Sequence, residues 1–443
     1  MRSLLLAYLL PWFLCPGISQ AQAPDKEPSR GRIAIHAARL IDGKSDRAVD
    51  NATVVIEGNK IISISTDSPG PSGARVIDLG DVTLLPGLID AHTHLLDQMD
   101  GTKVLLQDLE MLRIVATQST AERALLGAKL AKEVLYAGIT TVRDLGNSGV
   151  NGDVALRTAI RNGWVEGPRI IPSTRALAPP GGQFGTLTPE AQKLIEQEYV
   201  TLNGPQSARQ AVRQALYDGA GCIKVIVNGP ANVTPEEMNA IVTEAHLARV
   251  KVAAHAIGDG PTRIAAQAGV DSIEHAYVVP DDVLKLMAEK HIFLVPTDGT
   301  MRQLEAMFFG GREPSAAERN RIEEEFKPYV NGNRDRLQRA MKMGVAIAAG
   351  SDMYLTVAGE NRGQASLGVL EAYFDEGMPP IEVIRSATSR AAELLGLQDS
   401  IGTLEAGRVA DIIAVPGNPL KDITVLSRAT FVMKSGAVVK NSN

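Results

Sequence analysis

The chain has little cysteine, few aromatic residues and no strong excess of charge. Only two of its 443 residues are cysteine, Cys15 and Cys222, and aromatic residues make up 4%. The net charge is −6, and no stripe of basic residues runs along the sequence. These shortages exclude a surface for stacking bases and give no reason to expect a nucleic-acid partner. The remaining composition, 44% hydrophobic and 22% charged, predicts one large globular domain plus a smaller one.

The first 23 residues have the features of an export signal. Arg2 precedes the apolar run "LLLAYLLPWFLCPGIS", and Ala21-Gln22-Ala23 supplies a small-x-small cleavage site. A membrane anchor is the rival interpretation, but Pro11 and Pro16 interrupt a run that is already short for a span. A lipoprotein signal at Cys15 would need smaller residues before the cysteine. We therefore predict a signal peptide at residues 1–23 and a periplasmic or secreted protein with no membrane span after cleavage.

Removal of this segment leaves Cys222 as the only cysteine of the mature chain. No disulfide can then form within one chain, so the fold must be stabilised by a hydrophobic core.

Both ends of the mature chain have the alternation typical of β-strands. After a polar linker at residues 24–32, short β-like runs continue to about residue 80, and they are separated by glycine and proline. The C-terminal stretches "ADIIAVPGNP" and "ATFVMKSGAVVK" are similar, and the second predicts a hairpin around Ser435-Gly436.

Between these ends, buried-type strands alternate with segments of helical length, as in a parallel α/β sheet. The predicted strands are "LLPGLIDAHTH", "ITTVRDL", "RIIPST", "CIKVIV", "KVAAHA", "DSIEH", "IFLVPT" and "VAIAAGSD". Eight such units across residues 84–395 favour a closed (β/α)8 TIM barrel. An open doubly wound sheet is the alternative, but no G-x-G-x-x-G follows the first strand. The long polar segment Thr297–Val330 is a candidate lid over one end of the barrel.

Polar residues stand at or near the carboxyl ends of five of these strands. They are His92, His94, Lys224, His255, His275 and Asp352. The carboxyl ends of the strands form the rim where TIM barrels carry their chemistry, so we expect the six side chains to converge. His92 and His94 are two residues apart, so they point to the same face of their strand.

Each of these residues has a simpler explanation when it is taken alone. A single histidine is more often a hydrogen-bonded structural residue, Lys224 can snorkel to the surface, and Asp352 can cap a helix. To explain all six residues in this way, six separate structural roles must coincide at the same end of five strands. A single shared site explains the pattern better. Imidazole and carboxylate groups together suit zinc or a similar divalent metal.

Lys224 fits a metal site only if its amine has lost its charge. A buried lysine near positive charge has a lowered pKa, and the neutral amine can add carbon dioxide to form a carbamate. The carbamate is a carboxylate-like bridge that can hold two metals. The sequence therefore predicts two divalent ions, with zinc as the expected metal.

The motifs that carry these residues resemble those of the amidohydrolase superfamily in its binuclear form. The phrases "LLPGLIDAHTH", "GITTVRDLG", "GVDSIEHA" and "GTLEAGRVADIIAV" resemble its imidazolonepropionase-like and Xaa-Pro dipeptidase-like branch, which includes exported dipeptidases and amidases. The resemblance implies a small β-sandwich formed by residues 24–83 and 402–443 beside a hydrolase barrel at residues 84–401. It also implies a homo-oligomer.

The resemblance further implies a role for each ligand. His92, His94 and Asp352 would bind the more buried metal, and His255 and His275 the second. Carbamylated Lys224 and a hydroxide would bridge the two ions. Asp352 would take the proton from the attacking hydroxide and pass it to the leaving nitrogen.

Loops at the strand ends supply candidate substrate contacts, namely Gln183, Asn228 and Tyr277. Gln183 lies in "PPGGQFG", where relatives often carry a histidine. A glutamine can donate a hydrogen bond to a carbonyl oxygen but cannot titrate, so it cannot replace an imidazole in proton transfer. Tyr277 follows His275 by two residues and can donate to a developing oxyanion, although a packed aromatic residue is an equal alternative. Arg143 is expected to pair with Asp144, and Arg302 and Arg312 of the lid are candidates to hold a substrate carboxylate.

Three functions are compatible with these features. The leading one is an exported metal-dependent hydrolase of amide bonds in dipeptides or N-acyl amino acids. The second is a hydrolase of cyclic amides, lactones or a heterocycle, against which Lys224 counts because single-metal relatives generally lack it. The third is a non-enzymatic binding protein, which would be expected to have lost ligands, yet all six are present.

Overall fold

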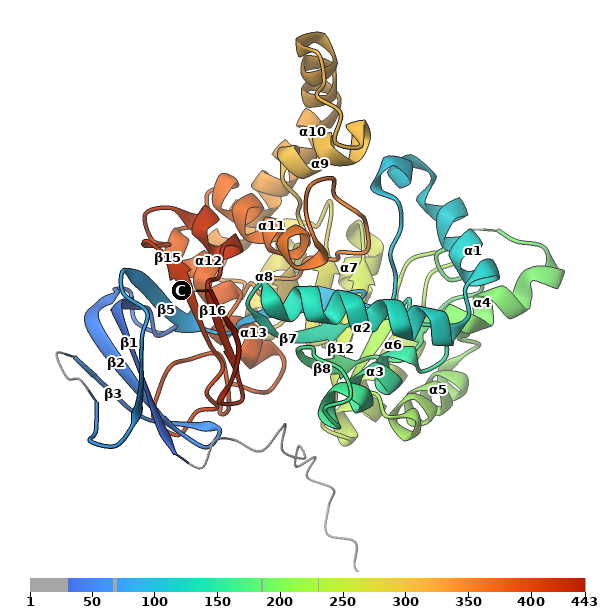
Figure 1. The fold of residues 1–443 in the computed structure, drawn as a ribbon. Helices are drawn as coiled ribbons and strands as arrows, with labels where there is room; N and C mark the ends of the chain where they lie inside the picture. Colours follow the sequence, from blue (N-terminus) through green and yellow to red (C-terminus); the bar gives the residue numbers. More distant parts are fainter. Residues whose placement is uncertain (1–30, 67–69, 185, 230, 443) are drawn as a thin grey trace, which may run out of the picture.

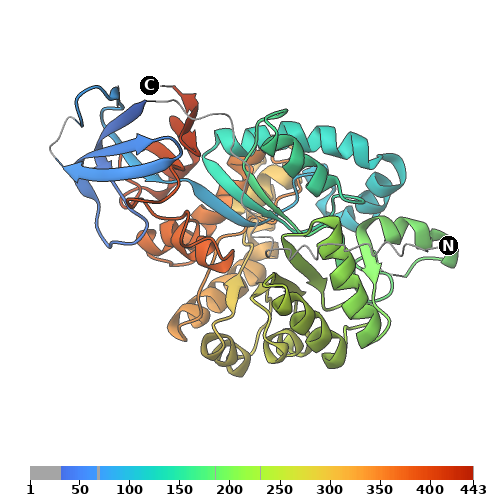
Figure 2. The ribbon, with the colours of Figure 1, turned by 90° about the horizontal axis from the view of Figure 1, so that it is seen from below.

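The structure is a computed structural model that describes residues 31–66, 70–184, 186–229 and 231–442. The signal peptide predicted at residues 1–23 lies outside the described residues. Figure 1 shows a β-rich part at one side, built from both ends of the chain, and a larger part of parallel strands and helices. Figure 2 gives the same division from below.

The two ends of the chain share one sheet. Its strands are β1 (Arg32–Leu40), β2 (Val49–Glu57), β3 (Lys60–Thr66), β4 (Arg75–Asp78), β5 (Val82–Pro86), β15 (Ile412–Pro416), β16 (Phe431–Lys434) and β17 (Ala437–Asn441). Their order is β17-β16-β15-β5-β1-β2-β3, and β4 pairs with β1. Antiparallel pairing of β15 with β5 joins the C-terminal segment to the N-terminal one. The fully buried Ile35, Val54, Ile412 and Phe431 belong to one apolar cluster of this sheet. The β structure predicted at both ends is thus present.

The central part contains parallel strands in two hydrogen-bonded groups. They are β6 (Leu88–Thr93), β7 (Ile139–Asp144), β8 (Arg169–Pro172), β9 (Ala176–Ala178), β10 (Tyr199–Thr201), β11 (Cys222–Ile226), β12 (Lys251–Ala256), β13 (Ser272–His275) and β14 (Phe293–Val295). One group has the order β6-β7-β8, and the other has the order β10-β9-β11-β12-β13-β14. Almost every residue of these strands is buried, because helices and neighbouring strands cover both of their faces, and valine, isoleucine and alanine are the commonest residues in them. The α/β class is confirmed.

Backbone hydrogen bonds connect the two groups at two places. Gly221 N donates to the carbonyl of Pro172 at 2.7 Å, which links β11 to β8. On the other side, Leu294 of β14 forms a parallel bridge with Ile347, and Asp352 N donates to the carbonyl of His92 at 2.7 Å. The eighth predicted strand, "VAIAAGSD", is therefore present as single bridges between β14 and β6 rather than as a continuous strand.

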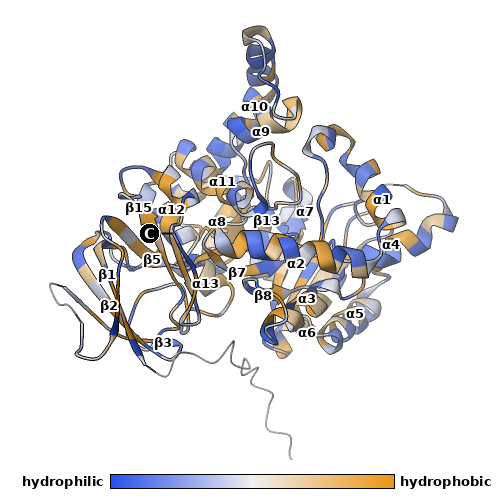
Figure 3. Cartoon of the chain, in the orientation of Figure 1, coloured by the Kyte–Doolittle hydropathy of each residue, from blue (hydrophilic) through white to orange (hydrophobic). Residues whose placement is uncertain are grey.

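The helices surround these strands. Their bounds are η1 (Gly101–Leu106), α1 (Gln107–Thr117), α2 (Thr120–Tyr136), α3 (Gly152–Arg161), η2 (Pro189–Ala191), α4 (Gln192–Glu198), α5 (Pro205–Asp218), α6 (Pro235–Leu247), α7 (Asp259–Ala268), α8 (Asp281–Glu289), α9 (Met301–Phe309), α10 (Ala316–Lys342), α11 (Arg362–Asp375), α12 (Pro380–Ser386), α13 (Ser389–Leu394) and η3 (Ile423–Ser427). Capping boxes fix several starts, such as Ser119 with Glu122 at α2. Figure 3 shows hydrophilic and hydrophobic residues alternating along α2, as expected for a helix with one buried face. In the described part of the chain, no helix is long and apolar enough to cross a membrane.

The predicted lid at Thr297–Val330 is mostly helical and not a loop. It forms α9 and the first half of α10, which extend from the rest of the molecule at the top of Figure 1. Capping boxes begin both helices, Thr300 with Gln303 and Ser315 with Glu318. The segment is rich in polar residues because the exposed faces of these two helices are polar, and not because it is a loop.

Candidate active site

A cavity of about 440 Å³ opens at the carboxyl ends of the parallel strands. Its wall includes all six predicted ligands, His92, His94, Lys224, His255, His275 and Asp352. Side chains from α1, α9 and α10 complete the wall, among them Met111, Leu304 and Tyr329. The convergence expected from the strand-end positions is therefore found, and part of the predicted lid lines the same cavity.

Asp352 lies at the centre of the histidines. Its Oδ1 is 3.0 Å from Nε2 of His94 and 3.3 Å from Nε2 of His92. Its Oδ2 is 3.9 Å from Nδ1 of His275. The rings of His255 and His275 lie 4.6 Å apart between their centroids. Lys224 joins the group through Nζ, which is 3.4 Å from Nε2 of His92.

The backbone is strained at two of these residues. Asp352 has a φ of 49° and His275 a φ of 66°, values in the left-handed region that non-glycine residues rarely adopt. Such strain costs on the order of 1–3 kcal/mol and clusters at functional sites. Gly350 allows the same loop to approach β6 closely, because a Cβ there would lie 2.7 Å from the Cβ of His92.

Burial and neighbouring charges shift the pKa values of these groups in opposite directions. Burial, with a further contribution from Lys224, lowers the pKa of His92 to about 4 and that of His255 to about 3. Burial also lowers the pKa of Lys224 to about 8. Burial alone would raise the pKa of Asp352, but the adjacent His92 and His94 hold it well below its usual value. Burial would lower the pKa of His94 as well, but its hydrogen bond to Asp352 raises it above its usual value. The site thus favours neutral imidazoles at His92 and His255, a more readily deprotonated amine and an ionised carboxylate.

Two acidic residues that the sequence did not single out support the ligands. Glu274 is fully buried, and its Oε2 lies 2.8 Å from Nδ1 of His92. Asp90 accepts hydrogen bonds from the backbone N–H groups of His92 and Ser351, so it ties β6 to the loop that carries Asp352. The sequence signal for both was a carboxylate one or two residues before a predicted ligand histidine, in "GLIDAH" and "DSIEH".

Arg143 has a different partner from the one expected. It donates to Oε1 of Glu274 at 2.9 Å, to Oγ of Ser272 at 3.0 Å and to the carbonyl of Ala91 at 2.6 Å. Asp144 instead accepts from Leu95 N and from Oγ of Ser148. The predicted Arg143–Asp144 pair was wrong because neighbouring residues of a strand point to opposite faces.

Of the three candidate substrate contacts, two line the cavity and one does not. Gln183 lines the cavity and accepts a hydrogen bond from the Tyr199 hydroxyl at 3.2 Å. Tyr277 also lines it, and its hydroxyl is 3.3 Å from that of Tyr329 on α10. Asn228 is not part of the cavity wall, and its Oδ1 accepts a hydrogen bond from Ile257 N at 3.1 Å.

The two lid arginines are paired with carboxylates on the surface. Arg302 pairs with Glu360 and Glu371, and Arg312 pairs with Glu318. Neither arginine belongs to the cavity wall. The expectation that they face a substrate carboxylate therefore has no support in this arrangement.

The donor atoms present suit a divalent metal. One ligand atom from each of His92, His275 and Asp352 lies within 4.8 Å of the others. Glu274 engages Nδ1 of His92, and the carbonyl of Gly146 engages Nδ1 of His94 at 2.9 Å. Both rings then present Nε2 toward Asp352, which is the orientation that such hydrogen bonds impose on metal-binding histidines.

Comparisons with known proteins agree with this arrangement. The model of the amidohydrolase family matches residues 83–439. An ochratoxinase of Aspergillus niger is 30% identical over 447 residues, which cover 92% of this chain and 86% of the relative. The crystal structure of a Xaa-Pro dipeptidase with bound methionine in its active site is 32% identical, with a TM-score of 0.77 over 93% of this chain and all of that one.

A prolidase complexed with N-methylphosphonate-L-proline is 28% identical, also with a TM-score of 0.77 over 93% of this chain and all of that one. The fold of this chain is thus that of amidohydrolases, which is of the TIM-barrel type. Because the family model spans most of the sequence and these relatives match along most of their length, the chain belongs to the amidohydrolase family and is a hydrolase of carbon–nitrogen bonds.

Proposed function

We propose that the protein is an exported, binuclear metal-dependent hydrolase that cleaves the amide bond of dipeptides or N-acyl amino acids. The observation that carries this proposal is the position of Lys224 within the histidine–aspartate group, with Nζ 3.4 Å from Nε2 of His92. An ammonium ion is a poor neighbour for a metal, whereas a lysine carbamate is an anionic ligand.

We infer that the parallel strands form a (β/α)8 barrel over residues 84–401 and that residues 24–83 and 402–443 form a β-sandwich beside it. The hydrogen bonds of Gly221 to Pro172 and of Asp352 to His92, which connect the two strand groups on both sides, support closure of the barrel. The pairing of β15 with β5 supports a terminal domain made from both ends of the chain.

In this proposal, His92, His94 and Asp352 hold one ion, His255 and His275 hold the other, and Lys224 bridges them as its carbamate. Zinc is the proposed metal because imidazole and carboxylate ligands predominate. Divalent ions at this site would polarise the scissile carbonyl and lower the pKa of a water molecule to near neutrality.

The protein's own residues then supply proton transfer and orientation. Asp352 is ionised and partly open to the cavity, so its carboxylate can accept a proton and return it to the leaving nitrogen. The hydroxyl of Tyr277 can donate to the carbonyl oxygen of a substrate. Gln183 also lines the cavity and offers its amide group for hydrogen bonding to a second polar group.

The size of the cavity and the relatives support a small substrate with an amide bond. A volume of about 440 Å³ lies within the range of small-molecule sites. The matched ochratoxinase, Xaa-Pro dipeptidase and prolidase also suggest that class of bond. Export after cleavage at Ala23 is supported by the sequence of residues 1–23 alone, and assembly as a homo-oligomer by the family resemblance alone.

The test is hydrolysis of a library of dipeptides and N-acyl amino acids by the zinc-loaded chain from Pro24 onward, in bicarbonate buffer. Lactones and cyclic ureas form the second arm. The proposal expects turnover in the first arm and loss of turnover in His255→Ala. His246→Ala is the matched control, because His246 pairs with Asp271 on the helical surface away from the cavity. Turnover confined to the second arm would replace the proposed substrate class, and no turnover in either arm would contradict an amide hydrolase.

A further inference from the structure

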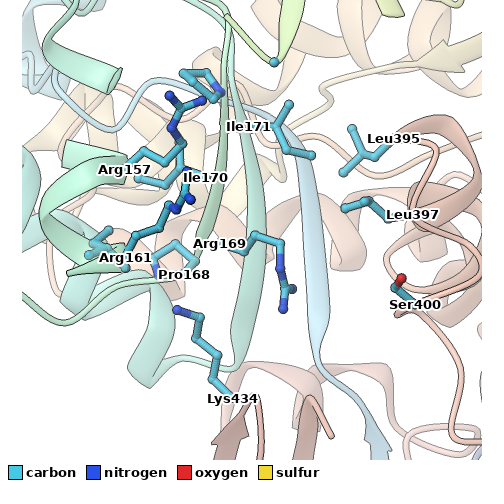
Figure 4. Close-up of a pocket in the computed structure, with 13 residues that line it drawn as sticks. Arg157, Arg161, Pro168, Arg169, Ile170, Ile171, Leu395, Leu397, Ser400 and Lys434 are labelled. Carbon is cyan, nitrogen blue, oxygen red and sulfur yellow. The ribbon is translucent and has the colours of Figure 1, made fainter. Parts of the chain in front are cut away.

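A second cavity, of about 320 Å³, lies at the amino ends of the parallel strands, opposite the histidine site. It is bounded by the end of α3, by β8, by the 395–400 segment after α13 and by Lys434 of β16. Figure 4 shows Arg157, Arg161 and Lys434 at one side and Leu395 and Leu397 at the other, with Arg169 between them. The cavity therefore joins a basic wall to an apolar one, across the boundary between the barrel strands and the terminal sheet.

Two arginines of the basic wall, Arg157 and Arg161, form no ion pair with any described residue. Arg169 is paired with Asp411 at 2.8 Å. Arg157 donates from Nη1 to the carbonyl of Gly219 at 2.8 Å, but its buried Nε has no hydrogen-bond partner among the described residues. Arg161 has neither a hydrogen bond nor an ion pair with any residue that the structure describes. The described residues of the cavity wall include no carboxylate.

Proximity of these cations has an electrostatic cost. Burial, followed by the charge of Arg161, lowers the pKa of Arg157. An anion in the cavity would remove that repulsion and would satisfy the unpartnered Nε, because a guanidinium presents donors in a planar fork that matches carboxylate and phosphate groups.

The apolar wall indicates what the rest of such a ligand is like. Leu395 and Leu397 line this cavity together with the partly exposed Ile171 of β8. The cavity thus combines apolar side chains with convergent charged groups, a combination that suits a small organic ligand with an ionic head. A bare inorganic ion would leave the apolar wall in contact with water.

We propose that this cavity binds a small amphiphilic anion, with a carboxylate or phosphate head on the arginines and an apolar chain against Leu395 and Leu397. The site is separate from the histidine cavity and shares none of its lining residues. Because its walls come from both the barrel strands and the terminal sheet, ligand binding should also stabilise their junction.

The experiment titrates octanoate and octyl phosphate into the full mature chain by calorimetry, with acetate and inorganic phosphate as matched head groups without a chain. Trp164 lies in the turn between Arg161 and Pro168, and Trp12, the other tryptophan, belongs to the predicted signal peptide. The emission of Trp164 therefore reports on this end of the barrel. We expect saturable binding of at least one long-chain anion, a parallel change in Trp164 emission, and a higher melting temperature.

Arg161→Gln should weaken this binding about tenfold, which is the usual effect of losing one charge-assisted hydrogen bond. Arg209→Gln, on the exposed face of α5, removes the same charge elsewhere and should leave the affinity unchanged. Arg161 has no partner to lose, so its replacement should not impair folding. Absence of saturable binding, equal affinity in Arg161→Gln, or equal affinity for acetate and octanoate would each overturn the proposal.

Discussion

Glu274 fixes the orientation of His92 through a 2.8 Å contact between its Oε2 and Nδ1 of the imidazole. The other carboxylate oxygen pairs with the fully buried Arg143 at 2.9 Å. Burial would raise the pKa of Glu274, but the charge of Arg143 and the contact with His92 lower it well below its usual value. An ionised Glu274 requires a proton on Nδ1, so Nε2 of His92 keeps its lone pair toward Asp352 and Lys224.

Replacement of this carboxylate should weaken metal binding without removing a ligand. In Glu274→Gln, the amide cannot accept from both His92 and Arg143, so metal affinity should fall about ten- to a hundredfold. Unpairing of the buried Arg143 should also cost about 3 kcal/mol of folding free energy. Competitive chelation and urea denaturation measure the two effects. Glu244→Gln, which removes an exposed partner of Arg213, is the control; unchanged metal affinity in Glu274→Gln would remove Glu274 from the account.

Asp352 should be required for turnover but not for folding. Asp352→Asn keeps the shape of the side chain and removes its capacity to accept a proton, so kcat should fall by about a hundred- to ten-thousandfold. The rate is measured at saturating zinc, and circular dichroism checks the fold. Asp399→Asn, at an exposed surface carboxylate, should be fully active. A kcat for Asp352→Asn within a few-fold of the parent would refute the proton-transfer role.

Tyr277 should act on kcat more than on KM if its hydroxyl binds the developing oxyanion. Tyr277→Phe should then lower kcat about a hundredfold, because such donors act mainly in the transition state. Tyr329→Phe removes the hydroxyl that lies 3.3 Å away and should change kcat much less. Equal losses in the two variants would instead indicate that the Tyr277–Tyr329 contact matters only for the position of α10.

Glu376 should make the protein less stable as the pH rises. It lies after α11 next to Asp298, with Arg334 and Arg336 of α10 nearby, and burial followed by the charge of Asp298 raises its pKa to about 9. A carboxyl group with a raised folded-state pKa stabilises the fold fully below its unfolded pKa, and that contribution is lost as the pH rises toward 9.

Glu376→Gln removes this proton uptake and should flatten the pH dependence. We expect the variant to gain on the order of 3 kcal/mol relative to the parent between pH 6 and pH 8.5. Urea denaturation at the two pH values measures the difference. Glu393→Gln, at an exposed partner of Arg390, should not show it, and parallel stability curves for the parent and Glu376→Gln would show that Glu376 does not carry this proton.

The convergence of the six residues could be predicted from the sequence. Residues such as His92, Lys224 and Asp352 stand at or near the carboxyl ends of predicted strands, and these ends meet at one rim in a parallel barrel. It was insufficient for Glu274 and Asp90, because the role of a carboxylate within a buried strand can be assigned only when its partner on another strand is known. The Arg143–Glu274 pair joins residues 131 positions apart. Proximity in sequence therefore led to the wrong partner.

The helical segments around residue 300 show a different limit. The polar composition of this segment suggested a loop that acts as a lid. The residue pairs Thr300–Gln303 and Ser315–Glu318, however, have the spacing of capping boxes and indicate the starts of two helices. Arg302 lies on α9, and Arg312 lies in the link between α9 and α10; each pairs with a glutamate instead of facing the cavity. For Arg302, side-chain direction on the helix, rather than residue type, decides that it does not line the cavity.

The most direct test of the two-metal account is the metal content and activity of Lys224→Ala beside the parent chain, both loaded with zinc in bicarbonate. We expect about two ions per chain in the parent. The variant should bind at most about one ion and should lose turnover, because it lacks the proposed bridging carbamate of Lys224. Lys132→Ala, at an exposed partner of Glu166, should match the parent. Two ions and full turnover in Lys224→Ala would contradict the bridging lysine.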